Sequence, residues 1–221
     1  MELLLPSLGQ GVKVGKLLCI GRNYAKHAAE MQSSVPEEPI VFLKPSTALV
    51  GNGGTVLLPE RSREVHHEVE LVAVIGVGGK RIPVEKALDH VDAYAVGLDM
   101  TARDLQAVAK RKGLPWSVAK GFDTFAPLGP LVDAGHIHDA QDLEIRLEVN
   151  GEVRQHGHTR DMMFPVARLV SYCSQIFSLM PGDLIYTGTP EGVGPVREGD
   201  VLEAHITGMP SLRVRVRREE V

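Results

Sequence analysis

Two glutamates and an aspartate have the residue types and the spacing of metal ligands. Glu68 and Glu70 are two positions apart in an apolar stretch, and Asp99 follows the apolar run 93–98. Side chains alternate along a strand, so both glutamates would point to one face, with Asp99 at a strand end. Three carboxylates form an all-oxygen ligand set, which suits Mg²⁺, Mn²⁺ or Ca²⁺ rather than Zn²⁺ or copper. Such a site would leave positions open for water and a bidentate substrate.

Other interpretations of the same residues stay open. Charged residues at alternate positions are typical of the solvated face of an antiparallel strand, and from this pattern alone that explanation of Glu68 and Glu70 is favoured. The adjacent histidines His66 and His67 suggest a transition-metal site instead. Neighbouring strand residues point to opposite faces, however, so both histidines cannot easily bind one ion. One of them could be a partner of a ligand.

A histidine and a glutamate near the N-terminus have the spacing of a catalytic pair. Asn23 is a plausible N-cap for a helix over 24–31, which places His27 and Glu30 on one face. The carboxylate could then orient an imidazole that takes a proton from water. Spacing alone favours an ordinary solvated pair. The helix has few apolar residues to dock it, and the polar segment 32–39 is expected to be a mobile loop, so the two together predict a lid.

The glycine-rich segment from Gly188 to Gly194 is a further candidate. It lacks the Gly-Lys-Ser/Thr ending of a phosphate-binding loop. It is either a tight structural turn or a set of backbone amides that cradle a substrate carboxylate. The two cysteines, Cys19 and Cys173, lie in apolar segments, and we expect both to be reduced thiols of the core.

The elements that must position these residues are mostly strands. A helix is expected over 84–90, and Thr101 with Asp104 forms a variant capping box for a helix to about Lys112 that stops at Gly113. Asn150-Gly151 predicts a type I′ hairpin turn. Apolar patterns predict strands at 16–20, 40–46, 56–59, 65–75, 93–98, 143–149, 183–187, 201–207 and 212–216. Pro165 begins a helix to about Leu179, with an apolar face of Leu169, Val170, Cys173, Ile176 and Phe177. Roughly ten strands without a regular βαβ repeat indicate a β-rich α+β fold.

Composition limits the function classes. The chain has 221 residues, 43% of them hydrophobic, and no linker divides it, so we expect one domain over 1–221 with a short lead-in over 1–15. The net charge of -4 with interspersed signs argues against nucleic-acid binding. The basic run 110–112 completes a helical turn, and the run 213–218 alternates with apolar residues as a solvated strand face. No signal peptide or apolar run of about 18–20 residues is present, so no membrane association and a cytoplasmic location are expected.

Taken together, these segments resemble the fumarylacetoacetate hydrolase family, above all its short acylpyruvate hydrolase and oxaloacetate decarboxylase branch. The resemblance implies a β-rich roll of mixed sheets with a few short helices, and a homodimer. It also implies Mg²⁺ or Mn²⁺, with Ca²⁺ as a substitute in crystals, bound by Glu68, Glu70 and Asp99. The matching segments run in the family's order over nearly the whole chain, namely 20–27, 42–46, 66–71, 97–104, 112–116, 119–120 and 182–195.

The resemblance further implies roles around this metal. His27 and Glu30 would activate water on a lid over the substrate, and Lys120 would stabilise developing charge. The substrate pocket would be lined by Arg22, Arg103, Gln106 and Thr189. The implied reaction is hydrolysis of the C–C bond of a 2,4-dioxo acid, such as acetylpyruvate or fumarylpyruvate, to pyruvate and a carboxylic acid. The alternatives are oxaloacetate decarboxylation or tautomerisation at the same metal, isomerisation or decarboxylation of a hydroxymuconate-type intermediate, and a non-catalytic oxo-acid-binding protein.

Overall fold

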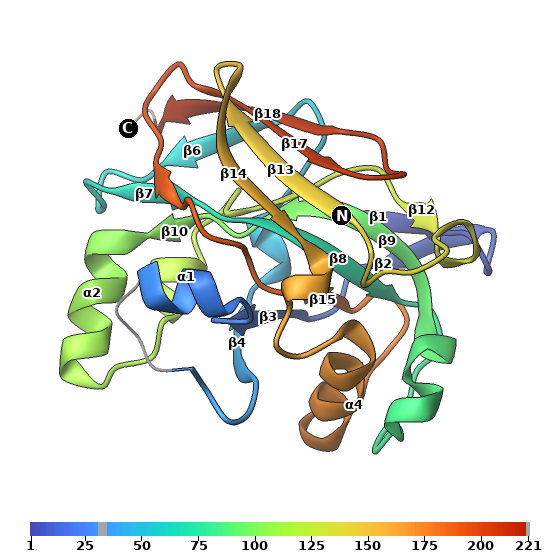
Figure 1. Cartoon of the computed structure of the whole chain (residues 1–221). Helices are drawn as coiled ribbons and strands as arrows, with labels where there is room; N and C mark the ends of the chain where they lie inside the picture. The colour runs from blue at the N-terminus through green and yellow to red at the C-terminus, as the bar shows by residue number, and fades with distance from the viewer. Residues whose placement is uncertain (31–34, 220–221) are drawn as a thin grey trace.

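The computed structural model describes residues 1–30 and 35–219 and is built mainly of curled, mixed β-sheets with a few short helices (Figure 1). This is the strand-rich α+β fold that the sequence predicts. The expected helix end at residue 31 and the part of the expected loop over 32–34 lie outside the described residues.

The largest sheet has the strand order β4-β3-β15-β8-β9-β11-β5, and β12 pairs with β9. Two of its pairs, β3 with β15 and β5 with β11, are parallel. The central strand β8 is buried along its whole length because Leu71 and Ala73 pack into one core cluster and Val72 and Val74 into another. The strands are β3 (Leu17–Gly21), β4 (Ile40–Lys44), β5 (Leu49–Gly51), β8 (Val69–Ile75), β9 (Val91–Leu98), β11 (Ala126–Leu128), β12 (Val132–Asp133) and β15 (Leu184–Tyr186).

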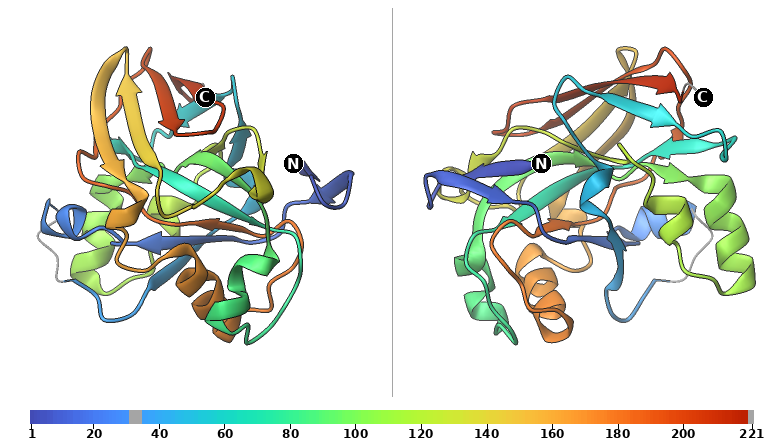
Figure 2. Two further views of the ribbon diagram at one scale, coloured as in Figure 1. Left: turned by 45° about the vertical axis from the view of Figure 1, so that its right-hand side comes forward. Right: turned by 180° about the vertical axis from the view of Figure 1, so that it is seen from behind.

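A second sheet, with the order β14-β13-β17-β18-β6, lies over one face of the first (Figures 1 and 2). Its inward side chains, including Ile145 and Leu202, share a core cluster with Leu71 of β8. Asn150 and Gly151 both have positive φ, 54° and 80°, which confirms the predicted hairpin turn. The strands are β6 (Thr55–Leu58), β13 (Glu144–Val149), β14 (Glu152–His158), β17 (Val201–Ile206) and β18 (Leu212–Arg218), and the arginines of β18 are exposed as predicted.

Two small sheets and the helices complete the described residues. The order β10-β7-β16 joins Thr101–Ala102, Val65–His67 and Gly194–Pro195, and β1 (Glu2–Leu5) pairs with β2 (Gln10–Lys13). The helices are α1 (Ala25–Glu30), α2 (Arg103–Lys112), α3 (Ser117–Lys120) and α4 (Val166–Ile176), with 3₁₀ turns at Ser46–Ala48, Val84–His90, Ala134–His136 and Thr159–Asp161. Helices α1 and α2 lie at the same end of the molecule (Figure 1). Within the described ranges, no helix is both long and apolar enough to span a bilayer.

Two predicted helix caps are wrong. Asn23 does not cap α1, because its Oδ1 accepts from the N–H of Phe164 and its Nδ2 donates to the carbonyls of Phe164 and Thr187. Thr101 does not cap α2, because it belongs to β10 and its hydroxyl donates to Glu68 Oε1 at 3.1 Å. In both cases a long-range partner in the fold satisfies the side chain that local spacing assigned to a cap.

Helix ends also show one agreement and one difference. Helix α2 ends at Gly113 with φ of 64°, as predicted. Helix α4 ends at Ile176 rather than near Leu179, and Ile176 is 51% exposed instead of belonging to the apolar face. Cys173 of α4 is buried and free, as expected of a core thiol, and so is Cys19.

Candidate active site

The sequence predicts one strand over 65–75, but the structure has two, because Glu68 interrupts the strand. Strand β7 pairs with β10 and β16, whereas β8 pairs with β9 and β15. The N–H of Asp99 donates to the carbonyl of Glu68 at 2.8 Å, so the end of β9 lies beside the break. Glu68, Glu70 and Asp99 each offer an oxygen atom within 4.8 Å of the others. All three are at most 5% exposed, which excludes the solvated strand face.

These three carboxylates fit a hard divalent cation. Buried carboxylates are unfavourable without positive charge beside them. Burial, followed by the charges of Asp99 and Glu68, raises the pKa of Glu70 well above its ordinary value. Among the described residues, Oδ1 of Asp99 accepts no hydrogen bond, although Lys44 is at ion-pair distance. The carboxylate oxygens of these three residues form the all-oxygen set that Mg²⁺, Mn²⁺ or Ca²⁺ prefers.

Three cations surround the carboxylates. Lys120 Nζ lies 2.9 Å from Glu68 Oε2 and 2.5 Å from Asp99 Oδ2, and Lys44 Nζ lies 2.5 Å from Asp99 Oδ1. Arg103 Nη2 lies 2.5 Å from Glu68 Oε1. Burial of Glu68 disfavours its charge, but Lys120 and Arg103 outweigh that effect and hold the pKa of Glu68 well below its usual range. The formal charges of the three acids and three bases therefore cancel.

Helix α2 brings Arg103 and Gln106 to the site on one face, as their spacing predicts. Arg103 Nη1 donates to Gln106 Oε1 at 2.7 Å, and Arg103 Nε donates to His66 Nδ1 at 3.4 Å. His67 turns the other way, toward Gln155. The two histidines thus have separate surroundings, and in the described part of the chain the only group with metal-ligand spacing is the acidic triad.

Helix α1 carries the predicted histidine–glutamate pair to the same place. His27 Nδ1 lies 3.3 Å from Glu30 Oε2, and both Glu30 oxygens are within 3.2 Å of the N–H of Gly192. His27 is buried whereas Glu30 is exposed, so the pair is not the fully solvated one that spacing alone favours. Burial lowers the pKa of His27, while Glu68 and Glu30 offset part of that effect. At neutral pH the imidazole is therefore uncharged and able to accept a proton.

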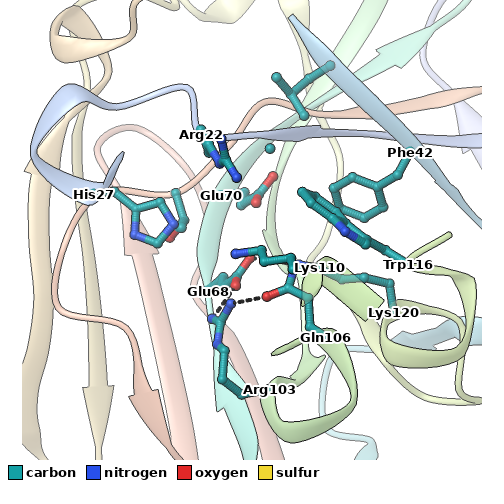
Figure 3. Close-up of a pocket in the computed structure, with 13 residues that line it drawn as sticks. Arg22, His27, Phe42, Glu68, Glu70, Arg103, Gln106, Lys110, Trp116 and Lys120 are labelled. Atoms are coloured by element: carbon teal, nitrogen blue, oxygen red, sulfur yellow. Dashed lines mark hydrogen bonds and ion pairs between the residues drawn. The ribbon is translucent and has the colours of Figure 1, made fainter. Parts of the chain in front are cut away.

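A pocket opens onto these residues (Figure 3). Eight of the ten residues predicted for the site line its wall, and Glu30 and Asp99 are not among the lining residues. The predicted lining residues are Arg22, His27, Glu68, Glu70, Arg103, Gln106, Lys120 and Thr189. Sequence reasoning missed Ile20, Gly21, Phe42, Lys110 and Trp116.

Lys110 is the most informative of the missed residues. It was assigned with Arg111 and Lys112 to an ordinary basic last turn, but Lys110 alone of the three is half-buried and lines the pocket. Its Nζ lies 5.5 Å from the ring centroid of Trp116. Burial, then the charges of Arg103 and Arg22, lowers the pKa of Lys110 to about 8. The sequence contained an indication that Lys110 belongs to the pocket, because it lies one helical turn beyond Gln106 on the same face of α2.

Arg22 has a backbone conformation that a non-glycine residue rarely adopts. Its φ is 58°, in the left-handed region. Its buried Nε has no hydrogen-bond partner among residues 1–30 and 35–219. Strain of this kind costs about 1–3 kcal/mol and concentrates at functional sites, so Arg22 is a strong candidate to bind a ligand group.

The glycine-rich loop binds the protein's own carboxylates. The N–H of Gly188 donates to Glu70 Oε2 at 2.8 Å, and that of Gly192 donates to Glu30. The predicted alternative, in which amides of this loop bind a substrate carboxylate, is therefore wrong for Gly188 and Gly192. Gly188 has φ of 97°, and a Cβ there would lie 2.6 Å from the Cβ of Asn23, so glycine is required.

Known proteins share this fold and much of this sequence. The chain is 50% identical to the mitochondrial oxaloacetate tautomerase FAHD1 of Arabidopsis thaliana, over 92% of this chain and 91% of that protein. It is 44% identical to a fumarylpyruvate hydrolase of Pseudomonas aeruginosa, whose crystal structure contains Mn²⁺ and pyruvate, with a TM-score of 0.92 over 99% and 96% of the two chains. It is 41% identical to a 5-carboxymethyl-2-hydroxymuconate delta-isomerase of Mycobacterium smegmatis, with a TM-score of 0.85 over 96% and 82%.

The family model described as fumarylacetoacetate (FAA) hydrolase C-terminal matches residues 16–217. That range includes all the residues predicted for the site, from Arg22 to Thr189. The chain therefore belongs to the fumarylacetoacetate hydrolase family, a family of enzymes.

Proposed function

We propose that this protein hydrolyses the C3–C4 bond of an acylpyruvate, with Mg²⁺ or Mn²⁺ held by Glu68, Glu70 and Asp99. The observation that carries this proposal is the buried, uncharged His27 beside Glu30, facing the same pocket as Glu68 and Glu70. A water-activating base and a cation site on one pocket are the two parts that hydrolytic C–C cleavage requires. The cation would act as a Lewis acid toward the carboxylate and 2-oxo oxygens of the substrate.

The charge balance of the site favours an oxo acid. Glu68, Glu70 and Asp99 are matched by Lys44, Lys120 and Arg103 in formal charge. A divalent ion would therefore bring a positive surplus to a buried pocket. Such a surplus attracts an anionic substrate and strengthens as water is excluded.

The residues of the chain divide the reaction between them. His27, oriented by Glu30, takes a proton from water, and the resulting hydroxide adds to the C4 carbonyl. The C3–C4 bond then breaks, its electron pair passes to pyruvate as the enolate, and a carboxylic acid is released. Lys120 and Arg103, which line the pocket and contact Glu68, would stabilise negative charge on the pyruvyl part. Protonation of the enolate at C3 gives pyruvate.

The lining of the pocket also supports an acyl group with its own negative charge. Arg22 and Lys110 line the pocket without a carboxylate partner among the described residues. Phe42 and Trp116, with ring centroids 5.6 Å apart, form an aromatic wall beside them. A flat, unsaturated acyl chain ending in a carboxylate, as in fumarylpyruvate, fits both features, so we propose a preference for it over acetylpyruvate.

A second candidate is keto–enol tautomerisation of oxaloacetate in the same pocket. The specific observation in its favour is the 50% identity to a protein named oxaloacetate tautomerase. Tautomerisation needs a base that moves a proton between C3 and oxygen but no attacking water. His27 could serve as that base, which makes the two activities compatible with one site.

A turnover screen tests the proposal. Protein freed of metal with a chelator and reloaded with Mg²⁺ or Mn²⁺ is assayed with acetylpyruvate, fumarylpyruvate and oxaloacetate side by side. Metal-dependent release of pyruvate from the first two is expected, with loss of about 10²–10⁴-fold in His27→Ala. Exposed His156→Ala serves as the control. Hydrolysis that survives in excess chelator or in His27→Ala contradicts the mechanism, and turnover of oxaloacetate alone favours the second candidate.

A further inference from the structure

The side chain of Gln155, on β14, joins two segments of the site and uses its full hydrogen-bonding capacity. Its Oε1 accepts from the N–H of Val69 at 3.0 Å and lies 3.0 Å from Nδ1 of His67. Its Nε2 donates to Thr189 Oγ1 at 2.8 Å and to the carbonyl of Pro190 at 2.9 Å. Gln155 is 1% exposed. It therefore connects the junction of β7 and β8 to the loop that carries Thr189.

The orientation of this amide is fixed by its backbone partners. The N–H of Val69 can only donate, and the carbonyl of Pro190 can only accept, so Oε1 and Nε2 of Gln155 cannot be exchanged. It follows that Nδ1 of His67 carries its hydrogen and donates to Oε1. Burial lowers the pKa of His67 to about 4, which agrees with a neutral ring. Each partner of Gln155 thus has a defined donor or acceptor role.

This network determines what the hydroxyl of Thr189 can do. The hydroxyl can accept and donate, and it already accepts from Gln155. Its own hydrogen must then point to another acceptor, and within residues 1–30 and 35–219 the structure shows none on the protein. Thr189 is buried and lines the same pocket as His27 and Glu70. The acceptor that completes the network is therefore expected to come from the bound molecule.

We propose that Gln155 is a positioning residue, which holds Thr189 so that its hydroxyl donates to a carboxylate oxygen of the substrate. Gln155 is not among the lining residues of the pocket, so it acts on the substrate through Thr189, while its bonds to Val69 and Pro190 hold the amide in place. This inference rests on the proposed function to the extent that a 2-oxo acid is the ligand.

Gln155→Glu tests the donor role with almost no change in shape. A carboxylate at this position cannot donate to Thr189 and instead accepts the hydroxyl hydrogen that the substrate would receive. Loss of a hydrogen bond to a charged group corresponds to about 10–100-fold in affinity. We expect that loss in KM, and in the dissociation constant of pyruvate for the Mn²⁺-loaded protein measured by calorimetry, with a smaller change in kcat.

A double-mutant cycle separates positioning from general damage. Thr189→Val removes the hydroxyl, so Gln155→Glu should change KM less than about threefold in that background if it acts through Thr189. Equal losses in both backgrounds would overturn the proposal. Gln155→Met, which has neither donor nor acceptor, provides the same cycle should the glutamate variant not fold.

Gln141→Glu is the matched control. Gln141 also joins two segments, through the carbonyl of Thr159 and the N–H of Val166, and it does not line the pocket. Its substitution should lower the melting temperature without changing KM.

If the unaltered protein binds pyruvate but turns over none of the three substrates, the proposed function fails. The effect of the variants on pyruvate binding still decides the role of Gln155 in that case. A pyruvate complex with Thr189 Oγ1 more than 3.5 Å from every ligand oxygen overturns the positioning role directly.

Discussion

The ammonium nitrogen of Lys44 lies 2.5 Å from Oδ1 of Asp99, and both side chains are shielded almost completely from solvent. Lys44 also donates to the carbonyls of Met100 at 2.9 Å and Phe125 at 2.5 Å. Its position is therefore fixed by two backbone carbonyls, one of them in the residue that follows Asp99. Burial lowers the pKa of Lys44, and the charge of Asp99 opposes that effect. Because Asp99 is a candidate metal ligand, protein stability and metal binding should be coupled at this contact.

Lys44→Met is expected to expose that coupling. Removing one partner of a buried ion pair costs about 3–5 kcal/mol, so the melting temperature of the metal-free variant should fall. Mn²⁺ should restore more stability to the variant than to the unaltered protein, because the ion replaces the lost charge. Lys16→Met, which breaks the ion pair with Asp183 away from the pocket, should lower stability without enlarging the Mn²⁺ effect. An equal Mn²⁺ effect in all three proteins contradicts the coupling.

Glu30→Gln should shift the pH dependence of hydrolysis. Burial lowers the pKa of His27, and Glu30 opposes that effect through its charge and hydrogen bond. Only the neutral imidazole accepts a proton, so kcat/KM should decline as the pH falls through a value below 6.5. Without the Glu30 charge the pKa of His27 falls further, and the decline moves to lower pH. The pH profile of fumarylpyruvate hydrolysis measures this, and a shift toward higher pH would show that His27 is not the titrating base.

The titration of Lys110 should weaken substrate binding at alkaline pH. Its pKa, lowered to about 8, means that it loses its charge as the pH rises above that value. KM for fumarylpyruvate should then increase by about three- to tenfold, the scale of one partly solvated ion pair. Lys110→Arg should keep KM flat to higher pH, because a guanidinium does not titrate in this range.

Lys112→Gln, at an exposed position on the same helix, is the control and should leave KM unchanged. The acetylpyruvate KM should depend little on Lys110, since that substrate has no second carboxylate. An equal effect of Lys110→Gln on the two substrates would place Lys110 near the pyruvyl end instead.

Gly188→Ala should weaken metal binding through the loop. The new Cβ would lie 2.6 Å from the Cβ of Asn23, which forces the loop to move and withdraws the N–H that Glu70 accepts. Gly53→Ala is the matched control, because Gly53 also has positive φ, 80°, but nothing lies within 4 Å of its Cβ position. Both variants carry the backbone strain of about 1 kcal/mol. Only Gly188→Ala should raise the dissociation constant of Mn²⁺ measured by calorimetry, and parallel changes would refute the loop's role.

The sequence predicted those parts of the site that depend on short spacing or on the family resemblance. Glu68 and Glu70 share a site because they are two apart, and Arg103 and Gln106 form a hydrogen bond because they are one helical turn apart. The choice between a solvated strand face and a metal site could not be made from that spacing. It depends on the burial of both glutamates and on neighbours such as Lys120, which are properties of the whole fold.

What the sequence missed depends on contacts between distant segments. Asn23 and Thr101 have typical cap spacing, yet their partners lie far along the chain at Phe164 and Glu68. Gln155 is the one buried residue of β14, whose other residues are exposed or half-buried, and nothing in its local sequence distinguishes it from a solvated residue. The role of such a side chain can be assigned only when the hydrogen bonds of both partners are known.

The contacts of Glu30 have a consequence for the order of events on α1. The carboxylate of Glu30 contacts His27 and also accepts from the N–H of Gly192. The same group therefore orients the imidazole and holds α1 against the glycine-rich loop. A movement of α1 away from the loop would break the hydrogen bond between Gly192 and Glu30. The orientation of the imidazole by Glu30 would change with it. If His27 is the base, as proposed, its ability to take a proton should therefore depend on the position of α1, because Glu30 makes both contacts.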